Sequence, residues 1–152
     1  MKRDQAGLLL KQGLVELRLA RQYLDYSFQQ VAALPQDLAG ASAAQLESVE
    51  AFSSRFARTV DLLVNKVLRS LDRAELKPEG TLLDVVNRAE QRGLVTRASE
   101  LREMKDVRNL IAHDYASAKA AEIFAYCREQ KPVLDDICNR VVTYATQVLS
   151  PD

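Results

Sequence analysis

Acid–base chemistry near neutral pH points to one side chain of this sequence, because the chain contains a single histidine, His113. Histidine is the residue whose unperturbed pKa lies closest to 7. It falls within Arg108-Asn109-Leu110-Ile111-Ala112-His113-Asp114-Tyr115, a segment that also supplies a guanidinium, a carboxamide and a phenol. A titratable base next to a fixed cation suits general acid–base work on a charged substrate such as a phosphate.

A helical projection divides this segment into two faces. Arg108 and Tyr115, seven residues apart, lie within about 20° of each other on an ideal helix. Asn109 and His113, four residues apart, share another face. His113 projects roughly 140° away from Arg108, so the two side chains do not converge within one ideal helix. Either the helix distorts near His113, or a second copy of the segment completes the site across a dimer interface.

The face that carries Arg108 also carries the apolar arc of the helix, formed by Leu101, Met104 and Ile111. A buried guanidinium is costly unless it is paired. We therefore expect this face to meet a partner, a cleft or a phosphate.

The segment resembles the Arg-Asn-x-x-x-His-x-Tyr signature of HEPN domains, and in particular that of the HepT-type toxins. The specific part of the resemblance is these eight residues. The placement of the signature on the fourth of about five helices, after a long second helix that bears aromatic residues, extends the resemblance over most of the chain.

The resemblance implies a metal-independent RNA endonuclease that works as a homodimer, with two copies of the motif facing one cleft. Arg108 and His113 would be the catalytic residues, with His113 as the base and Arg108 as the cation against the phosphate. Asn109 would orient His113 or hold a phosphate oxygen. Tyr115 would be the site at which a small nucleotidyltransferase antitoxin adds AMP, and the added phosphate would oppose RNA binding.

Two other functions stay open at this point. Some relatives are described as non-catalytic, substrate-binding partners of nucleotidyltransferases, and the motif of a helical adaptor could arise by coincidence. The intact set of Arg108, Asn109, His113 and Tyr115 favours the toxin, because an adaptor does not require it.

Charged residues outside the motif have ordinary interpretations. Asp106 lies near the arc of Asn109 and His113, and Asp114 follows His113, but both are interpreted as surface acids. The second helix has a basic side that could bind RNA phosphates. Interspersed acids, Asp61 and Asp72, make an ordinary charged face the preferred interpretation. That basic side consists of Arg55, Arg58, Lys66, Arg69 and Arg73.

Neither a cofactor nor a metal is expected. The sequence shows no glycine-rich phosphate loop, and one histidine with two distant cysteines cannot build a zinc site. Cys127 and Cys138 lie eleven residues apart on one predicted helix, roughly 16 Å, which is beyond disulfide reach. They are interpreted as core thiols of a protein in the reducing cytoplasm.

The spacing of apolar residues predicts an all-α fold. Amphipathic helices are expected over about 5–34, 41–76, 82–92, from Thr96 or Ser99 to His113 or Tyr115, and 117–149 with a bend at Pro132. Thr81 and Asp84 read as an N-terminal cap and Gly93 as a C-terminal cap. Short links favour antiparallel neighbours, so we predict an up-and-down antiparallel bundle of four to five helices.

Composition is consistent with one globular domain over residues 1–152. Apolar residues make up 47% and charged residues 28%, and the formal net charge is zero, with 21 basic and 21 acidic side chains. Any affinity for RNA must therefore come from a local basic surface. The apolar run Leu8-Leu9-Leu10 gives way at once to Lys11, so neither a signal peptide nor a membrane span is expected.

Overall fold

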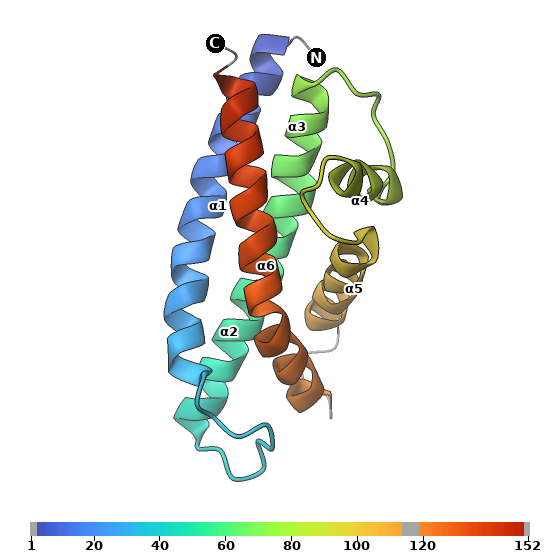
Figure 1. Ribbon diagram of the computed structural model, residues 1–152. Helices are drawn as coiled ribbons and strands as arrows, with labels where there is room; N and C mark the ends of the chain where they lie inside the picture. Colours follow the sequence, from blue (N-terminus) through green and yellow to red (C-terminus); the bar gives the residue numbers. More distant parts are fainter. Residues whose placement is uncertain (1–2, 114–118, 151–152) are drawn as a thin grey trace.

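Three long helical rods, with two shorter helices at their side, form the computed structural model (Figure 1). It describes residues 3–113 and 119–150. The elements are α1 (Arg3–Val31), α2 (Ala43–Asp61), η1 (Leu62–Leu68), α3 (Arg69–Ala74), α4 (Leu82–Gln91), α5 (Ala98–His113) and α6 (Ala120–Leu149). The described ranges contain no strand, which confirms the all-α prediction.

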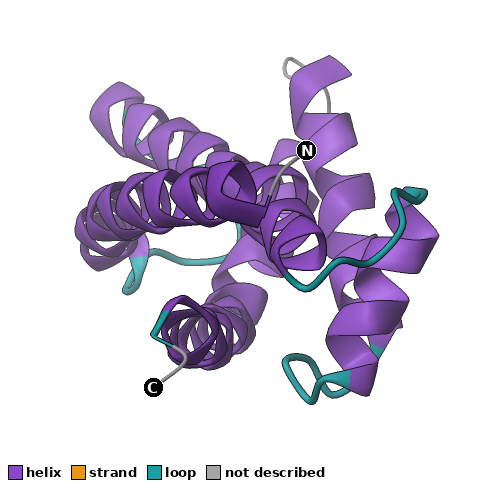
Figure 2. Ribbon diagram, turned by 90° about the horizontal axis from the view of Figure 1, so that it is seen from above, coloured by secondary structure: helices purple, strands orange, loops and turns teal. Residues whose placement is uncertain are grey.

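The rods alternate in direction along the chain, as the short connections predicted. In Figure 1, α1 runs down, α2 to α3 runs up, α5 runs down and α6 runs up, while α4 lies across the side of the bundle. The view along the rods in Figure 2 shows how the helices group around a common interior. The antiparallel up-and-down arrangement is confirmed.

The core is one apolar cluster to which all six α-helices contribute. Phe52 and Phe56 of α2 and Phe124 of α6 are fully buried, and the ring of Phe52 meets that of Phe124 edge to face at 6.2 Å. Burying side chains of this size stabilises the fold by about 1.5–3 kcal/mol each. Leu34 and Leu38 of the first connection pack against the same cluster, so this loop is apolar because it covers the core.

The second rod contains a π-helical segment that the sequence did not predict. α2, η1 and α3 follow one another without a break, but the seven residues of η1 form the wider turn of a π-helix. One row of buried residues in this rod, formed by Phe56, Val60, Val64 and Leu68, has a spacing of four. On an α-helix each such step rotates by about 40°, and the wider turn offsets that drift, which keeps the row facing the core.

The predicted caps of α4 are confirmed. Thr81 and Asp84 form a reciprocal capping box, and Gly93, with φ of 76°, follows the last turn. Helix α5 begins at Ala98, which agrees with the predicted start near Thr96 or Ser99. The backbone N–H of Ala98 donates to the Glu90 side chain of α4 at 2.8 Å. A residue of another helix therefore accepts the first N–H of α5, where the sequence suggested a local cap by Thr96 or Ser99.

The last helix begins at Ala120 and continues through Pro132 to Leu149. Its predicted start at Ser117 lies outside the described residues, and the bend at Pro132 stays a prediction. None of the described helices combines the length and the hydropathy that crossing a bilayer requires.

Candidate functional site

Arg108 lies on α5 and is held by an acid from a different helix. Its Nε donates to Oδ2 of Asp61, the last residue of α2, at 2.6 Å. This contact uses the inner nitrogen of the guanidinium, so the two terminal amino groups extend beyond the carboxylate. Nη1 donates to the side-chain oxygen of Asn109 at 3.3 Å, and one third of the Arg108 side chain is exposed. Asp61 thus fixes the guanidinium at Nε, while the side chain remains partly exposed to solvent.

The same carboxylate also holds a lysine. Lys105 donates from Nζ to Oδ1 of Asp61 at 2.7 Å, and its side chain is 11% exposed. Lys105 and Arg108 are three residues apart and share one face of α5, so a single carboxylate bridges both. The trio of Asp61, Lys105 and Arg108 carries one net positive charge. The site therefore remains attractive to an anion although Arg108 is paired.

The Arg108 face was expected to meet a partner, a cleft or a phosphate. The structure shows that the partner is an acid of the same chain, Asp61. The apolar arc is buried, as predicted, with Leu101 and Met104 fully buried and Ile111 5% exposed. Arg108, at the edge of this arc, pairs with Asp61 rather than lying unpaired in the core. The pairing satisfies the guanidinium electrostatically and sets its direction at the same time.

His113 and Asn109 lie on the exposed side of α5. His113 is the last residue of the helix, and both side chains are exposed. Because α5 remains α-helical through His113, the described residues do not show the distortion that would bring His113 towards Arg108. The axial separation of the two residues is about 7.5 Å, and they project in different directions. One copy of α5 therefore does not bring Arg108 and His113 together.

Tyr115 and Asp114 lie outside the described residues. Their roles stay predictions, and so does the assignment of Tyr115 as the site of AMP addition.

The basic side of the second rod is largely engaged within the chain. Arg55 donates to Ser27 Oγ at 2.6 Å, and Lys66 pairs with Glu16 at 2.8 Å. Arg69 donates to the Gly80 carbonyl at 2.9 Å, and Arg73 pairs with Glu79 at 3.3 Å. Arg58 is exposed and lies one turn before Asp61. The interpretation as an ordinary charged face fits these contacts.

Sequence reasoning did not identify Asp61 and Lys105 as part of the site. Asp61 and Asp72, the two acids assigned to the charged face of the second rod, each pair with two basic side chains. Asp61 pairs with Lys105 and Arg108, and buried Asp72 pairs with Arg88 and Arg92 at 3.1 and 2.6 Å. A usable signal was present, because two cations beside the apolar arc of α5 require an acid on a neighbouring helix. That argument does not say which acid it is, and only the packing of α2 against α5 selects Asp61.

No group of three or more histidine, cysteine or acidic side chains that could hold a metal occurs among the described residues. Cys127 and Cys138 are buried and unbridged in the core, as the sequence predicted. Burial raises the pKa of each thiol to about 12. These two thiols are structural residues of the interior.

Comparison with known proteins places this arrangement in a family. Residues 29–141 match the family described as ribonuclease HepT-like. The match covers most of the chain and includes Asp61, Lys105, Arg108, Asn109 and His113. The chain belongs to this family of HepT-like ribonucleases. The searches of curated proteins and of solved structures gave no match to this chain.

Proposed function

We propose that this chain is a metal-independent RNA endonuclease, the cytoplasmic toxin of a HEPN/nucleotidyltransferase toxin–antitoxin pair. The observation that carries the proposal is the fixed guanidinium of Arg108. Asp61 holds it at Nε, Asn109 lies at its tip, and His113 follows on the exposed end of the same helix. Membership of the HepT-like ribonucleases supports RNA as the substrate.

The reaction uses the 2′-hydroxyl of the RNA as the nucleophile. His113 takes the proton of this hydroxyl, O2′ bonds to the adjacent phosphorus, and the P–O5′ bond breaks. The electron pair of the broken bond goes to O5′, which takes a proton from a second, protonated histidine. Arg108 stabilises the charge on the phosphorane oxygens. The products are a 2′,3′-cyclic phosphate and a 5′-hydroxyl end.

A second copy of the chain supplies the missing half of this site. The helical path of α5 keeps Arg108 and His113 of one copy apart, which supports a composite site at a homodimer cleft. In such a cleft one His113 acts as the base and the other as the acid. Asn109 would orient the imidazole or hold a phosphate oxygen.

Tyr115 is the proposed point of control. It follows His113 by two residues, so AMP on its hydroxyl would place an anionic phosphate beside the catalytic pair. This charge would repel the RNA backbone and occupy the cation that the substrate needs. The cognate nucleotidyltransferase antitoxin would carry out the modification.

Growth on induction tests the proposal. Wild type is expected to arrest growth of the expressing cells, whereas Arg108→Ala and His113→Ala are expected to be harmless. Arg140→Ala is the matched control, because Arg140 is an exposed arginine of α6, outside the helix that carries the motif. This control should remain as toxic as wild type. Equal toxicity of all variants, or of none, contradicts the toxin.

Cleavage in vitro tests the chemistry. Purified wild type should cut RNA in the presence of EDTA and leave 2′,3′-cyclic phosphate ends, while His113→Ala should leave the RNA intact. Cleavage that requires an added divalent metal would overturn the mechanism. Binding of a nucleotidyltransferase without any RNA cleavage would identify the chain as the non-catalytic, substrate-binding or adaptor subunit.

A further inference from the structure

A groove with aromatic and cationic side chains lies between α1 and α2. One part is a hollow of about 350 Å³, lined by Tyr23 of α1 and by Arg55 and Arg58 of α2, among others. A second hollow, of about 340 Å³, has Tyr26 of α1 in its lining. Arg55 lines both hollows, so they adjoin. We call the two hollows together the α1–α2 groove.

The two tyrosines of this groove are exposed to solvent. Tyr23 is 59% exposed and Tyr26 is 62% exposed. They stand three residues apart on one side of α1, about 4.5 Å along its axis. An exposed aromatic ring offers a face on which a nucleobase can stack, and every base has such a face. The pair therefore suits unpaired bases of RNA without demanding a particular sequence.

Arg55 holds the ring of Tyr23 in position. Its Nη1 donates to Ser27 Oγ at 2.6 Å and to the Tyr23 carbonyl at 3.3 Å. The guanidinium that is anchored in this way lies over the Tyr23 ring, 5.4 Å from the centroid. Tyr23 remains largely exposed nevertheless, so a base can still reach it. A ring that is oriented before the ligand arrives reduces the entropy cost of stacking.

Arg58 supplies a cation for a phosphate beside the tyrosines. It is exposed, and within the described ranges its side chain forms no hydrogen bond or ion pair. Glu16, the acid in the lining of the same hollow, pairs with Lys66 at 2.8 Å. Arg55 and Arg58 therefore give this hollow a net positive charge, which attracts phosphate. The adjoining hollow contains Glu47 and Arg55, so the phosphate contact is expected at the Arg58 end.

The groove leads to the proposed catalytic site across the exposed side of α2. Arg55, Arg58 and Asp61 follow one another at three-residue steps, so each is turned by about 60° and displaced by about 4.5 Å from the one before. Arg55 contacts α1, and Asp61 contacts Arg108 of α5. Exposed Arg58 lies between them. One strand of RNA can therefore pass from the tyrosines over Arg58 to Arg108.

We propose that the α1–α2 groove binds a single-stranded segment of the substrate RNA next to the cleaved bond. Bases stack on Tyr23 and Tyr26, and Arg58 holds a phosphate. The inference rests on the proposed ribonuclease function and narrows its substrate class, because only unpaired bases can stack on side chains. The groove adds affinity and takes no part in breaking the P–O5′ bond.

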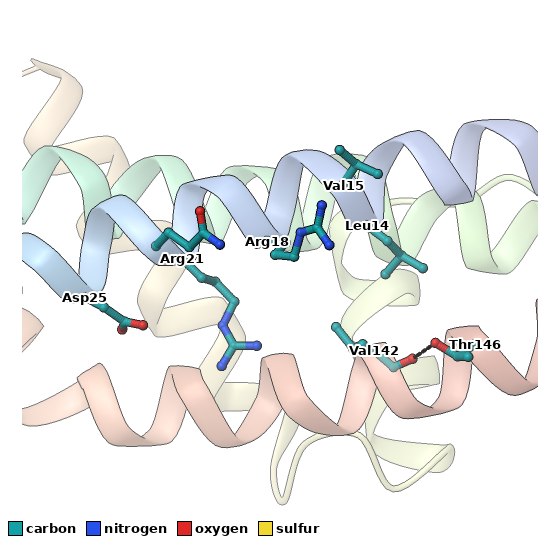
Figure 3. Close-up of a pocket in the computed structure, with 8 residues that line it drawn as sticks. Leu14, Val15, Arg18, Arg21, Asp25, Val142 and Thr146 are labelled. Carbon is teal, nitrogen blue, oxygen red and sulfur yellow. Dashed lines mark hydrogen bonds between the residues drawn. The ribbon is translucent and has the colours of Figure 1, made fainter.

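The hollow on the other side of α1 has a different character. It measures about 460 Å³ and lies between α1 and α6 (Figure 3). The described residues that line it include no aromatic side chain. Figure 3 shows Arg21 extending from α1 towards α6, where it donates to Asn139 at 2.9 Å. Arg18 of this hollow is exposed as Arg58 is, so it provides a matched control for charge.

Binding of a short fluorescein-labelled single-stranded RNA, followed by fluorescence anisotropy, tests the stacking. All variants carry His113→Ala, so that the RNA stays intact. Tyr23→Ala is expected to weaken binding about 10-fold, as the loss of one stacking partner does. Tyr23→Phe keeps the ring and should bind like the parent. Leu8→Ala is the matched control, because Leu8 of α1 is 57% exposed, and it should also bind like the parent.

The salt dependence of the same binding tests the phosphate contact. Arg58→Ala should weaken binding several-fold and reduce the slope of log affinity against log salt by about 1. Arg18→Ala removes an equal charge from the other side of α1 and should change neither quantity. Equal losses in these two variants would mean that only overall charge matters, which would overturn the proposal. Unchanged affinity of Tyr23→Ala would overturn it as well.

The groove and the proposed activity can fail separately. If wild type binds the RNA through Tyr23 and Arg58 but leaves it uncut, the ribonuclease is contradicted and the groove is supported. If wild type cuts the RNA, and Tyr23→Ala and Arg58→Ala on the wild-type background bind and cut it equally well, the ribonuclease stands and the groove is overturned. Normal RNA affinity of these variants with lost binding of the nucleotidyltransferase would assign the groove to a protein partner and overturn the proposal too.

Discussion

Asp61 is the residue on which the geometry of the proposed site depends. Its two carboxylate oxygens hold Lys105 and Arg108 at 2.7 and 2.6 Å, so one side chain of α2 sets the position of two cations on α5. Charge-assisted hydrogen bonds of this length are short and directional. We therefore expect Asp61 to act on catalysis through Arg108 and to be a positioning residue.

Substitution Asp61→Asn should reduce RNA cleavage on the order of 100-fold, because small displacements of a catalytic group cost about that much. The substitution also leaves buried Lys105 without its carboxylate, and breaking a buried pair costs about 3–5 kcal/mol. The double variant Asp61→Asn/Lys105→Met removes that buried charge. Its free energy of unfolding should recover while its cleavage rate remains low. Rates are measured on a defined RNA, and stabilities by urea unfolding.

The comparison includes two controls. Lys105→Met alone keeps the pair of Asp61 and Arg108, so its cleavage rate should stay within a few-fold of wild type. Asp106→Asn alters an exposed acid of the same helix and should have no effect. If the double variant cleaves RNA as fast as Lys105→Met, Asp61 contributes only to stability.

The catalytic candidates could be named from the sequence, whereas the residue that positions them could not. His113 is unique in the chain, and Arg108 and Asn109 stand at fixed offsets from it, so one segment of sequence contains the information. The pairing of Asp61 with Arg108 joins residues 47 positions apart. A projection of one helix shows that Arg108 needs a partner, but the partner follows from how two helices pack.

Two helix ends of the same geometry carry different residues. After α4, Gly93 has φ of 76°, and Leu94 N–H donates to the Ala89 carbonyl at 2.9 Å. After α3, Leu76 has φ of 61°, and Lys77 N–H donates to the Asp72 carbonyl at 2.8 Å. Glycine adopts this left-handed conformation without strain, whereas a side chain at the same place costs about 1 kcal/mol.

Replacing Leu76 by glycine should therefore raise the free energy of unfolding by about 1 kcal/mol. Little burial is lost, because Leu76 is 70% exposed. Gly93→Ala should lower the free energy of unfolding by a similar amount. Leu76→Ala serves as control, since it removes the apolar side chain but keeps the strain. A gain from Leu76→Ala equal to that from Leu76→Gly would show that exposure of the leucine, rather than its backbone, is responsible.

Local sequence predicted the elements well where their ends are determined locally. The capping box of Thr81 and Asp84 and the turn at Gly93 need only neighbouring residues, and both predictions are confirmed. The start of α5 agrees with the prediction near Thr96 or Ser99, but the acceptor for its first backbone N–H is Glu90 of another helix, which local sequence does not indicate. The π-helical turn was not indicated by the sequence; it lies against α1, where a Cβ on Gly13 would lie 3.2 Å from a methyl of Val67.

At the scale of the molecule, a helix can be assigned correctly while half of its surface remains unexplained. The periodicity of α1 identified the buried row, which includes Leu10, Leu17 and Leu24. That row accounts for the helix, so the exposed apolar side chains on its outer face were not needed to predict it. They are Leu8, Val15, Leu19, Tyr23 and Tyr26. Only burial in the folded chain separates the two faces.

The interior of the bundle should also respond to alkaline pH as a unit. Cys127 and Cys138 are fully buried on α6, and burial raises the pKa of each thiol from 9.0 to about 12. Burial likewise raises the pKa of Tyr144, whose hydroxyl donates to Glu75 at 2.8 Å. In each case the folded chain keeps a proton that the unfolded chain loses.

The free energy of unfolding should therefore fall as pH rises from about 9 to about 12. In that range the unfolded chain binds fewer protons than the folded chain, so the slope of stability against pH is negative, by up to about 1.4 kcal/mol per pH unit for each thiol. Below about pH 8 both states keep nearly all of the thiol protons, and the two cysteines add no slope. Urea unfolding at a series of pH values measures the effect. The variant Cys127→Ala/Cys138→Ala should show a shallower decline, with the remainder due to tyrosines and to Lys131, whose pKa is also raised in the folded chain. An unchanged slope in this variant would mean that the thiols do not titrate between the two states.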